Sequence, residues 1–136
     1  MSKSNTTEND VLIKLFQKTE LSWEAATNLY VSLHTQDPTD TGDQTSYEIT
    51  YTAPYARQAV ARSASGWDVA GNIASNKAQI SFPTCTGGST TATYVAIGTT
   101  LAATGQILYS GSCTSLAISN GIQPQFAIGA LTITED

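Results

Sequence analysis

Turn signals interrupt this chain at short intervals from Thr35 onward and limit every later segment to a few residues. Gly and Pro are the strongest local breakers of regular structure, and Asn-Gly favours a tight hairpin turn. The clearest signals are Ser65-Gly66, Gly71-Asn72, Pro83, Gly87-Gly88 and Asn120-Gly121. Short segments separated by turns at intervals of roughly 8–12 residues are typical of antiparallel sandwiches and barrels. The chain is therefore predicted to be all-β, an antiparallel β-sandwich with a jelly-roll-like arrangement.

The first predicted strand is the most clearly marked. Leu29, Val31 and Leu33 recur with period two and fall on one face of an extended segment. The next ten residues, 35–44, contain Pro, Gly and three Asp, which predicts a long surface loop. Further strands are expected at 48–52, 57–63, 67–69, 79–82, 91–97, 106–110, 115–119, 125–128 and 130–134.

One short amphipathic helix is predicted near the N-terminus, at about 8–18. Thr7 resembles an N-cap, and Leu12, Leu15 and Phe16 recur with helical spacing. Such an apolar stripe must cover something, either the protein's own sheet or a neighbouring subunit. The chain of 136 residues is long enough for one compact core. We expect an N-terminal arm with the helix at 1–28 and a β-sandwich domain at 29–136.

The second half of the chain is almost free of charge. Between Val69 and Thr134 the only charged side chain is Lys77, and Thr, Ser, Ala and Gly take the place of charged residues. The whole chain is 12% charged, against about a quarter in an ordinary soluble domain. Such a surface repels a neighbour weakly, so it suits a protein that packs against copies of itself or against a large assembly.

Composition also excludes several classes of partner. The net charge is −5 and the six basic residues are scattered, which argues against nucleic-acid binding. No run of about 18 apolar residues is present, so no membrane span is expected. The first residues lack an apolar core followed by a small-residue cleavage site, so we expect synthesis in a cytoplasm.

Candidate chemical motifs are few. Asp37, Asp40 and Asp43 could supply oxygen ligands to a cation, but their spacing is not that of an EF-hand loop, and a solvated loop is the preferred interpretation. His34 precedes Asp37, yet no nucleophile motif accompanies it, so a capping or turn hydrogen bond is expected. Neither Cys85 nor Cys113, the two cysteines of the chain, belongs to a Cys-x-x-Cys pair.

Two cysteines and one histidine are too few for a zinc site of Cys and His, and we expect no cofactor and no metal. Free thiols are the expectation for Cys85 and Cys113 in a reducing compartment, although a disulfide between them stays open. The aromatic residues are spread through the chain, so core and subunit contacts are preferred to a stacking platform for carbohydrate. Tyr55 and Trp67 are the chosen candidates for an interface, because large aromatics dominate such contacts.

Several segments resemble a known family. They are YVSLHTQDP from Tyr30, YARQAVARS from Tyr55, ISFPTCTGG from Ile80 and ISNGI from Ile118. Together, from Leu29 to Asp136, they are similar to small virion proteins of tailed bacteriophages, often labelled tail-fibre or minor structural proteins. The shared segments are turns, strand starts and aromatic residues. The resemblance therefore implies a component of the phage particle and brings no catalytic residue with it.

These observations predict a non-enzymatic virion structural protein that self-associates, as a homotrimer, and decorates the capsid exterior as a cement protein. Its partners would be itself and the major capsid protein or tail proteins. The stripe of Leu12, Leu15 and Phe16 would be the assembly anchor. The alternatives are a tail or tail-fibre-associated protein and, in a different class, a carbohydrate-binding module. An enzyme is disfavoured, because the second half holds few acids and bases.

Overall fold

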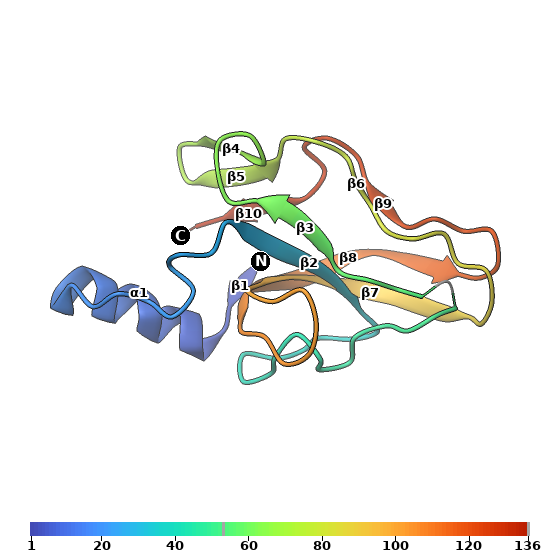
Figure 1. Ribbon diagram of the computed structural model, residues 1–136, viewed down its shortest axis with the longest axis horizontal. Coiled ribbons are helices and arrows are strands. Elements are labelled where there is room, and N and C mark those ends of the chain that lie inside the picture. Colours follow the sequence, from blue (N-terminus) through green and yellow to red (C-terminus); the bar gives the residue numbers. More distant parts are fainter. Residues whose placement is uncertain (53, 136) are drawn as a thin grey trace.

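The computed structural model describes residues 1–52 and 54–135, and every strand pair in them is antiparallel (Figure 1). The largest sheet has five strands. Their order across the sheet is β1 (Ser2–Lys3), β8 (Ile107–Ile118), β7 (Thr90–Gly98), β2 (Asn28–His34) and β3 (Gln58–Ala61). The expected all-β antiparallel fold with one N-terminal helix is confirmed.

A second layer covers one face of this sheet and is divided into two smaller sheets. One contains β10 (Thr132–Thr134), β5 (Ile73–Asn76) and β4 (Trp67–Ala70), and the other contains β6 (Ile80–Ser81) and β9 (Gln125–Phe126). Figure 1 shows both on the same side of the main sheet. The core lies between the layers and includes Val31, Val95, Ile97, Phe82, Ile118 and Leu131. The arrangement is a sandwich with one continuous and one divided layer.

Helix α1 (Asn5–Gln17) begins three residues earlier than the expected 8–18. Its N-cap is Ser4, not Thr7, because the Ser4 hydroxyl accepts a hydrogen bond from the Thr7 backbone N–H at 3.3 Å. The helix ends at Lys18, which adopts the left-handed conformation with φ of 54°. None of the described helices is long and apolar enough to cross a bilayer.

The strand predictions for two parts of the chain were wrong in detail. The expected strands at 106–110 and 115–119 are one strand, β8, which continues through a bulge where its register with β7 shifts between Ala92 and Tyr94. Residues 73–76 were not predicted as a strand, yet they pair with β4 around a turn at Gly71, where φ is 63°. Both errors arise because strand pairing is set by distant partners and not by local composition.

The segment 48–52 was predicted as a strand, and it forms only isolated bridges at its two ends. Its alternation nevertheless reflects burial, since Ile49 and Tyr51 are 1% and 8% exposed. Arg57 makes a bidentate pair with the Glu48 carboxylate at 2.7 Å for each bond. The third Arg57 nitrogen, Nη1, donates to the carbonyl of Thr100 at 3.1 Å. This buried pair holds the loop that follows β2 against the end of the sandwich.

Candidate assembly surfaces

Helix α1 is attached to the sandwich by its polar face. The hydroxyls of Ser4 and Thr7 both donate to the carbonyl of Ile107, at 2.5 and 2.9 Å. The side-chain amide of Gln106 donates to Thr7 Oγ1 at 3.0 Å and to Asp10 Oδ2 at 2.7 Å. These bonds join the first turns of the helix to the start of β8, 100 residues later in the chain. No local sequence pattern could have revealed this attachment.

A second attachment comes from the segment that follows the helix. The indole N–H of Trp23 donates to Asp10 Oδ2 at 2.8 Å, and Lys14 forms an ion pair with Glu24. The hydrogen bond from Lys14 is the main cause that lowers the pKa of the Glu24 carboxyl. Arg62 stacks over Trp23, 4.8 Å from the ring centroid, and donates to the Glu24 carbonyl at 2.6 Å. The polar face of α1 is thus held from two sides.

The apolar face of α1 points away from the protein. The exposed fractions rise along the helix, from 37% for Val11 and 55% for Leu12 to 71% for Leu15 and 82% for Phe16. Thr7 is the only residue of the helix that is buried. An ordinary surface helix has the opposite orientation, with its apolar stripe facing the core. Of the two surfaces that the sequence left open for this stripe, its own sheet is excluded by the structure.

The three residues predicted as an assembly anchor, Leu12, Leu15 and Phe16, are therefore brought together on one exposed face. Figure 1 shows α1 standing out from the sandwich at one end of the molecule. Exposed apolar side chains are normal when scattered singly, whereas a contiguous set marks a contact site. We call the surface formed by Val11, Leu12, Leu15 and Phe16 the helix face.

The two predicted interface aromatics lie inside the protomer. Tyr55 stacks on Phe82 with the ring centroids 5.9 Å apart, and its hydroxyl oxygen accepts the backbone N–H of Leu33 at 2.9 Å. Burial raises the pKa of the Tyr55 hydroxyl. Trp67 is 9% exposed and belongs to the core. Both rings therefore pack within the chain, and a contact with another subunit stays a prediction for them.

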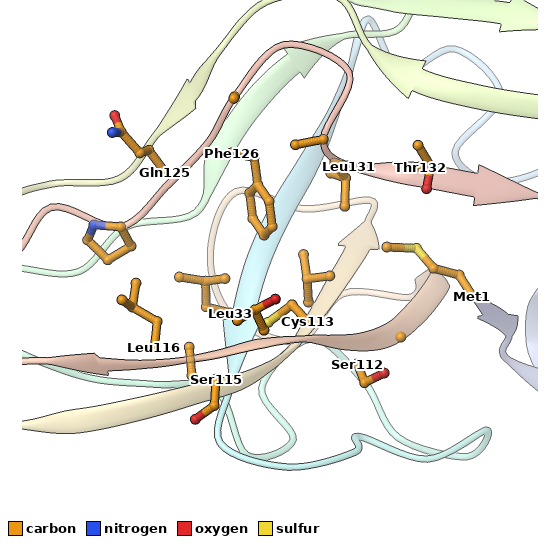
Figure 2. Close-up of a pocket in the computed structure, with 17 residues that line it drawn as sticks. Met1, Leu33, Ser112, Cys113, Ser115, Leu116, Gln125, Phe126, Leu131 and Thr132 are labelled. Atoms are coloured by element: carbon orange, nitrogen blue, oxygen red, sulfur yellow. The ribbon is translucent and has the colours of Figure 1, made fainter.

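A groove of about 680 Å³ opens between the middle of β8 and the segment around β9. We call it the β8–β9 groove. Figure 2 shows Phe126 and Leu131 projecting into it from one wall, with Cys113 facing them from β8, while Ser112 and Ser115 point away. None of the side chains that line it is charged, although the N-terminal residue Met1 is part of the lining. The deep apolar lining of this groove belongs to the buried core, since Leu33, Val95 and Leu131 are at most 3% exposed.

A second groove of about 680 Å³ lies between the β4–β5 hairpin and the main sheet. We call it the hairpin groove. Its apolar lining includes Val69, which is 74% exposed, and Ile73, which is 44% exposed. In contrast to the β8–β9 groove, its lining contains three charged residues, Arg62, Asp68 and Glu135.

The residues considered for chemistry have structural partners. His34 is fully buried, donates from Nδ1 to the Ser46 carbonyl at 2.8 Å and lies 2.9 Å from the Ser32 hydroxyl through Nε2. This is the turn hydrogen bond expected for His34, and Asp37 takes no part in it. Burial lowers the pKa of His34. Asp37 instead accepts the backbone N–H of Thr39 at 2.9 Å.

The other acids of the loop are also engaged locally. Asp40 accepts the Ser2 hydroxyl, and Asp43 accepts the backbone N–H of Thr45 at 2.7 Å. Within residues 1–52 and 54–135, no three His, Cys, Asp or Glu side chains are grouped to hold a metal ion. The thiols of Cys85 and Cys113 are both free, the first buried and the second half-buried. Burial raises the pKa of the Cys113 thiol.

A protein-family model matches most of the chain. The model of a protein family described as "Podophage GP4 fiber I protein gp80" matches residues 2–134. No curated protein matches the chain. The matched region includes the helix face, both grooves apart from Met1 and Glu135 at their ends, and all the strands.

Proposed function

This chain belongs to the podophage GP4 fiber I protein family, and from that premise we propose that it is a non-enzymatic subunit of a phage fibre, attached through the helix face. The family is one of phage virion structural proteins, which agrees with the resemblance found in the sequence. The outward orientation of Leu15 and Phe16 is the observation that carries the mode of attachment.

The energetics of the helix support attachment by this face. A helix of 13 residues is marginal in water by itself. Here the polar bonds to Ile107 and Gln106 keep it folded without burying its apolar stripe. Burying a side chain such as Leu or Phe is worth about 1.5–3 kcal/mol. Covering the exposed apolar side chains of the helix face with a partner would therefore be energetically favourable.

The family description supports one of the two locations considered for the protein. The sequence alone favoured a capsid decoration protein, with the tail or tail fibre as the alternative. The printed family description names a fibre, so we place the protein there and treat the capsid exterior as the competing location. The partners we propose are further copies of the chain, as a homotrimer, and the tail proteins that carry the fibre, in place of the major capsid protein.

The non-enzymatic part of the proposal is supported by the family and by the environment of the titratable side chains. His34 is enclosed and bound to Ser46 and Ser32, where no substrate could reach it. Arg57 and Glu48 satisfy each other. A carbohydrate-binding module is disfavoured, because the ring of Tyr55 stacks on Phe82 within the chain and Trp67 is 9% exposed.

Particles carrying Leu12→Asp in this protein test the proposal. Loss of the protein from purified particles is expected, because an Asp in the helix face cannot be desolvated at an interface. Leu101→Asp is the matched control, since Leu101 is 56% exposed and Leu12 is 55% exposed, and Leu101 lies outside the helix and both grooves. Retention of the Leu12→Asp protein would contradict attachment through the helix face.

Cryo-microscopy of particles with and without the protein tests the location. Density lost from the fibre or tail is the expected result. Density lost over the shell would contradict this location and support a position on the capsid exterior.

A further inference from the structure

We propose that Asn120 is a site of spontaneous deamidation that the fold keeps closed, because a hydrogen bond holds the backbone N–H of Gly121 on the buried carbonyl of Cys85. The reaction converts the side-chain amide into a carboxylate and consumes only water. It proceeds in chains where the turn at 119–122 has opened. The inference concerns the single chain and does not depend on how the protein is attached to the particle.

The dipeptide Asn120-Gly121 has the chemistry that this reaction needs. Asn120 is the only asparagine of the chain that precedes a glycine. Glycine has no side chain that would hinder the approach of its own backbone nitrogen to the preceding side chain. Both residues are exposed, so water reaches them. Asn72 is also exposed, but the bulky Ile73 follows it.

The reaction is an intramolecular substitution at the side-chain amide of Asn120. Hydroxide removes the N–H proton of Gly121, and the nitrogen attacks Cγ of Asn120. A bond forms between these two atoms, the bond from Cγ to Nδ2 breaks, and ammonia leaves after it takes a proton from water. A five-membered cyclic imide remains, and one water molecule opens it to aspartate or to isoaspartate.

In the folded chain the attacking nitrogen is already engaged. The N–H of Gly121 donates to the carbonyl of Cys85 at 2.8 Å, and Cys85 is 0% exposed. The N–H of Cys85 donates back to the carbonyl of Ile122 at 2.9 Å, so two backbone bonds hold the turn on the core. The nitrogen of Gly121 therefore keeps its proton and is directed toward Cys85, away from the side chain of Asn120.

The same turn explains why a labile dipeptide is present. The N–H of Ile122 closes the turn on the carbonyl of Ser119 at 3.0 Å, and Gly121 has φ of 88° at the third position. A side chain is disfavoured at this φ, so the turn requires the glycine that also makes Asn120 reactive. The bond to Cys85 is then the element of the fold that separates a stable turn from a reactive one.

Opening of the turn is expected to be rare and its product permanent. Opening leaves the buried carbonyl of Cys85 without a partner, so the reaction should be about 10- to 100-fold slower in the folded chain than in the unfolded chain. Deamidation adds one negative charge to the net charge of −5. The new carboxylate lies within residues 78–134, which contain no charged side chain. Each chain that has opened here therefore keeps a covalent mark.

Peptide mapping of the full-length chain by mass spectrometry tests the proposal. The chain is incubated at mildly alkaline pH, once folded and once unfolded in urea, and the peptide that contains Asn120 should be converted about 10- to 100-fold faster in urea. Amide exchange of Gly121 in the folded chain, read by NMR, should be slowed by a similar factor, because the same opening frees this N–H. The peptide that contains Asn72 is the internal control and should stay unmodified in both samples.

Asn120→Gln is the chemical control, since its longer side chain cannot form the five-membered ring, and it should show no conversion in either state. Circular dichroism identical to that of the parent confirms that this variant is folded. Equal rates for Asn120 in the folded and unfolded chain would overturn the protection by Cys85. An unmodified Asn120 in urea would show that the dipeptide is not a deamidation site. Fast conversion in a folded chain whose Gly121 amide exchanges slowly would contradict the requirement for opening.

Discussion

Trp23 donates its indole N–H to the carboxylate of Asp10 across 2.8 Å, and this bond closes the helix onto the segment that follows it. The same carboxylate oxygen accepts the side-chain amide of Gln106 at 2.7 Å. Asp10 therefore links three separate parts of the chain, and it does so on the side of α1 opposite Leu12 and Phe16. The orientation of the helix face depends on it.

Replacing Asp10 with Ala is expected to loosen α1 while leaving the sandwich folded. Hydrogen bonds to a charged group contribute about 1.5–3 kcal/mol, so amide exchange in the helix should accelerate roughly 10- to 100-fold. Hydrogen–deuterium exchange read by mass spectrometry measures this directly. Glu20→Gln is the control, an exposed acid just after the helix, and it should leave exchange unchanged. Equal protection of α1 in Asp10→Ala would show that Ser4 and Thr7 alone orient it.

Breaking the pair between Glu48 and Arg57 is expected to destabilise the whole fold. The Arg57 side chain is 3% exposed, and Glu48→Gln leaves its charge buried without compensation. Such a loss typically costs about 3–5 kcal/mol, measurable as the free energy of unfolding in urea. The exposed pair of Lys77 and Asp68 is the control, and Lys77→Met should change stability by less than about 1 kcal/mol. Similar costs for both variants would contradict the argument from burial.

Stability is expected to fall on mild acidification because of His34. Burial lowers the pKa of His34 from its ordinary value of 6.5, so the unfolded chain binds a proton more readily than the folded chain. The contribution of His34 is fully present above pH 6.5 and is lost as the pH falls below that value through the lower folded pKa. Unfolding midpoints in urea at pH 7.5, 6.5 and 5.5 measure it.

The variant His34→Asn isolates this effect, because His34 is the only histidine of the chain. The groups packed near the ring include Glu48, which favours the charged form, and Arg57, which disfavours it. The slope of stability against pH between 7.5 and 5.5 should be much smaller in His34→Asn. An unchanged slope would assign the dependence to other groups.

Trp67 is expected to tolerate Phe far better than Ala. Its indole Nε1 is buried and has no hydrogen-bond partner among the described residues. Trp67→Phe removes this unsatisfied donor. Its removal gains about 1–3 kcal/mol, which offsets part of the packing free energy lost with the larger ring. Trp67→Ala leaves a cavity and should cost about 3–5 kcal/mol of unfolding free energy. Thermal unfolding of both variants tests the difference, and equal losses would refute it.

Much of the secondary structure could be predicted because it depends on neighbours in the chain. Period-two alternation located β2, and the turn at Gly71 marked the end of β4 correctly. The long strand β8 was predicted as two strands, because the small polar residues around Ser112 give no strand signal of their own. Pairing with β7 keeps that segment extended, and the bulge accommodates the extra residues.

The amino-acid spacing alone placed Leu12, Leu15 and Phe16 on one side of a helix, since helical spacing is a local property. The sequence also determined that the second half would build a surface without charge. The direction in which the helix face points depends on contacts that are distant in the sequence. Ser4 and Thr7 donate hydrogen bonds to Ile107, and Asp10 accepts one from Gln106. These partners lie about 100 positions away and leave no periodic trace in the sequence.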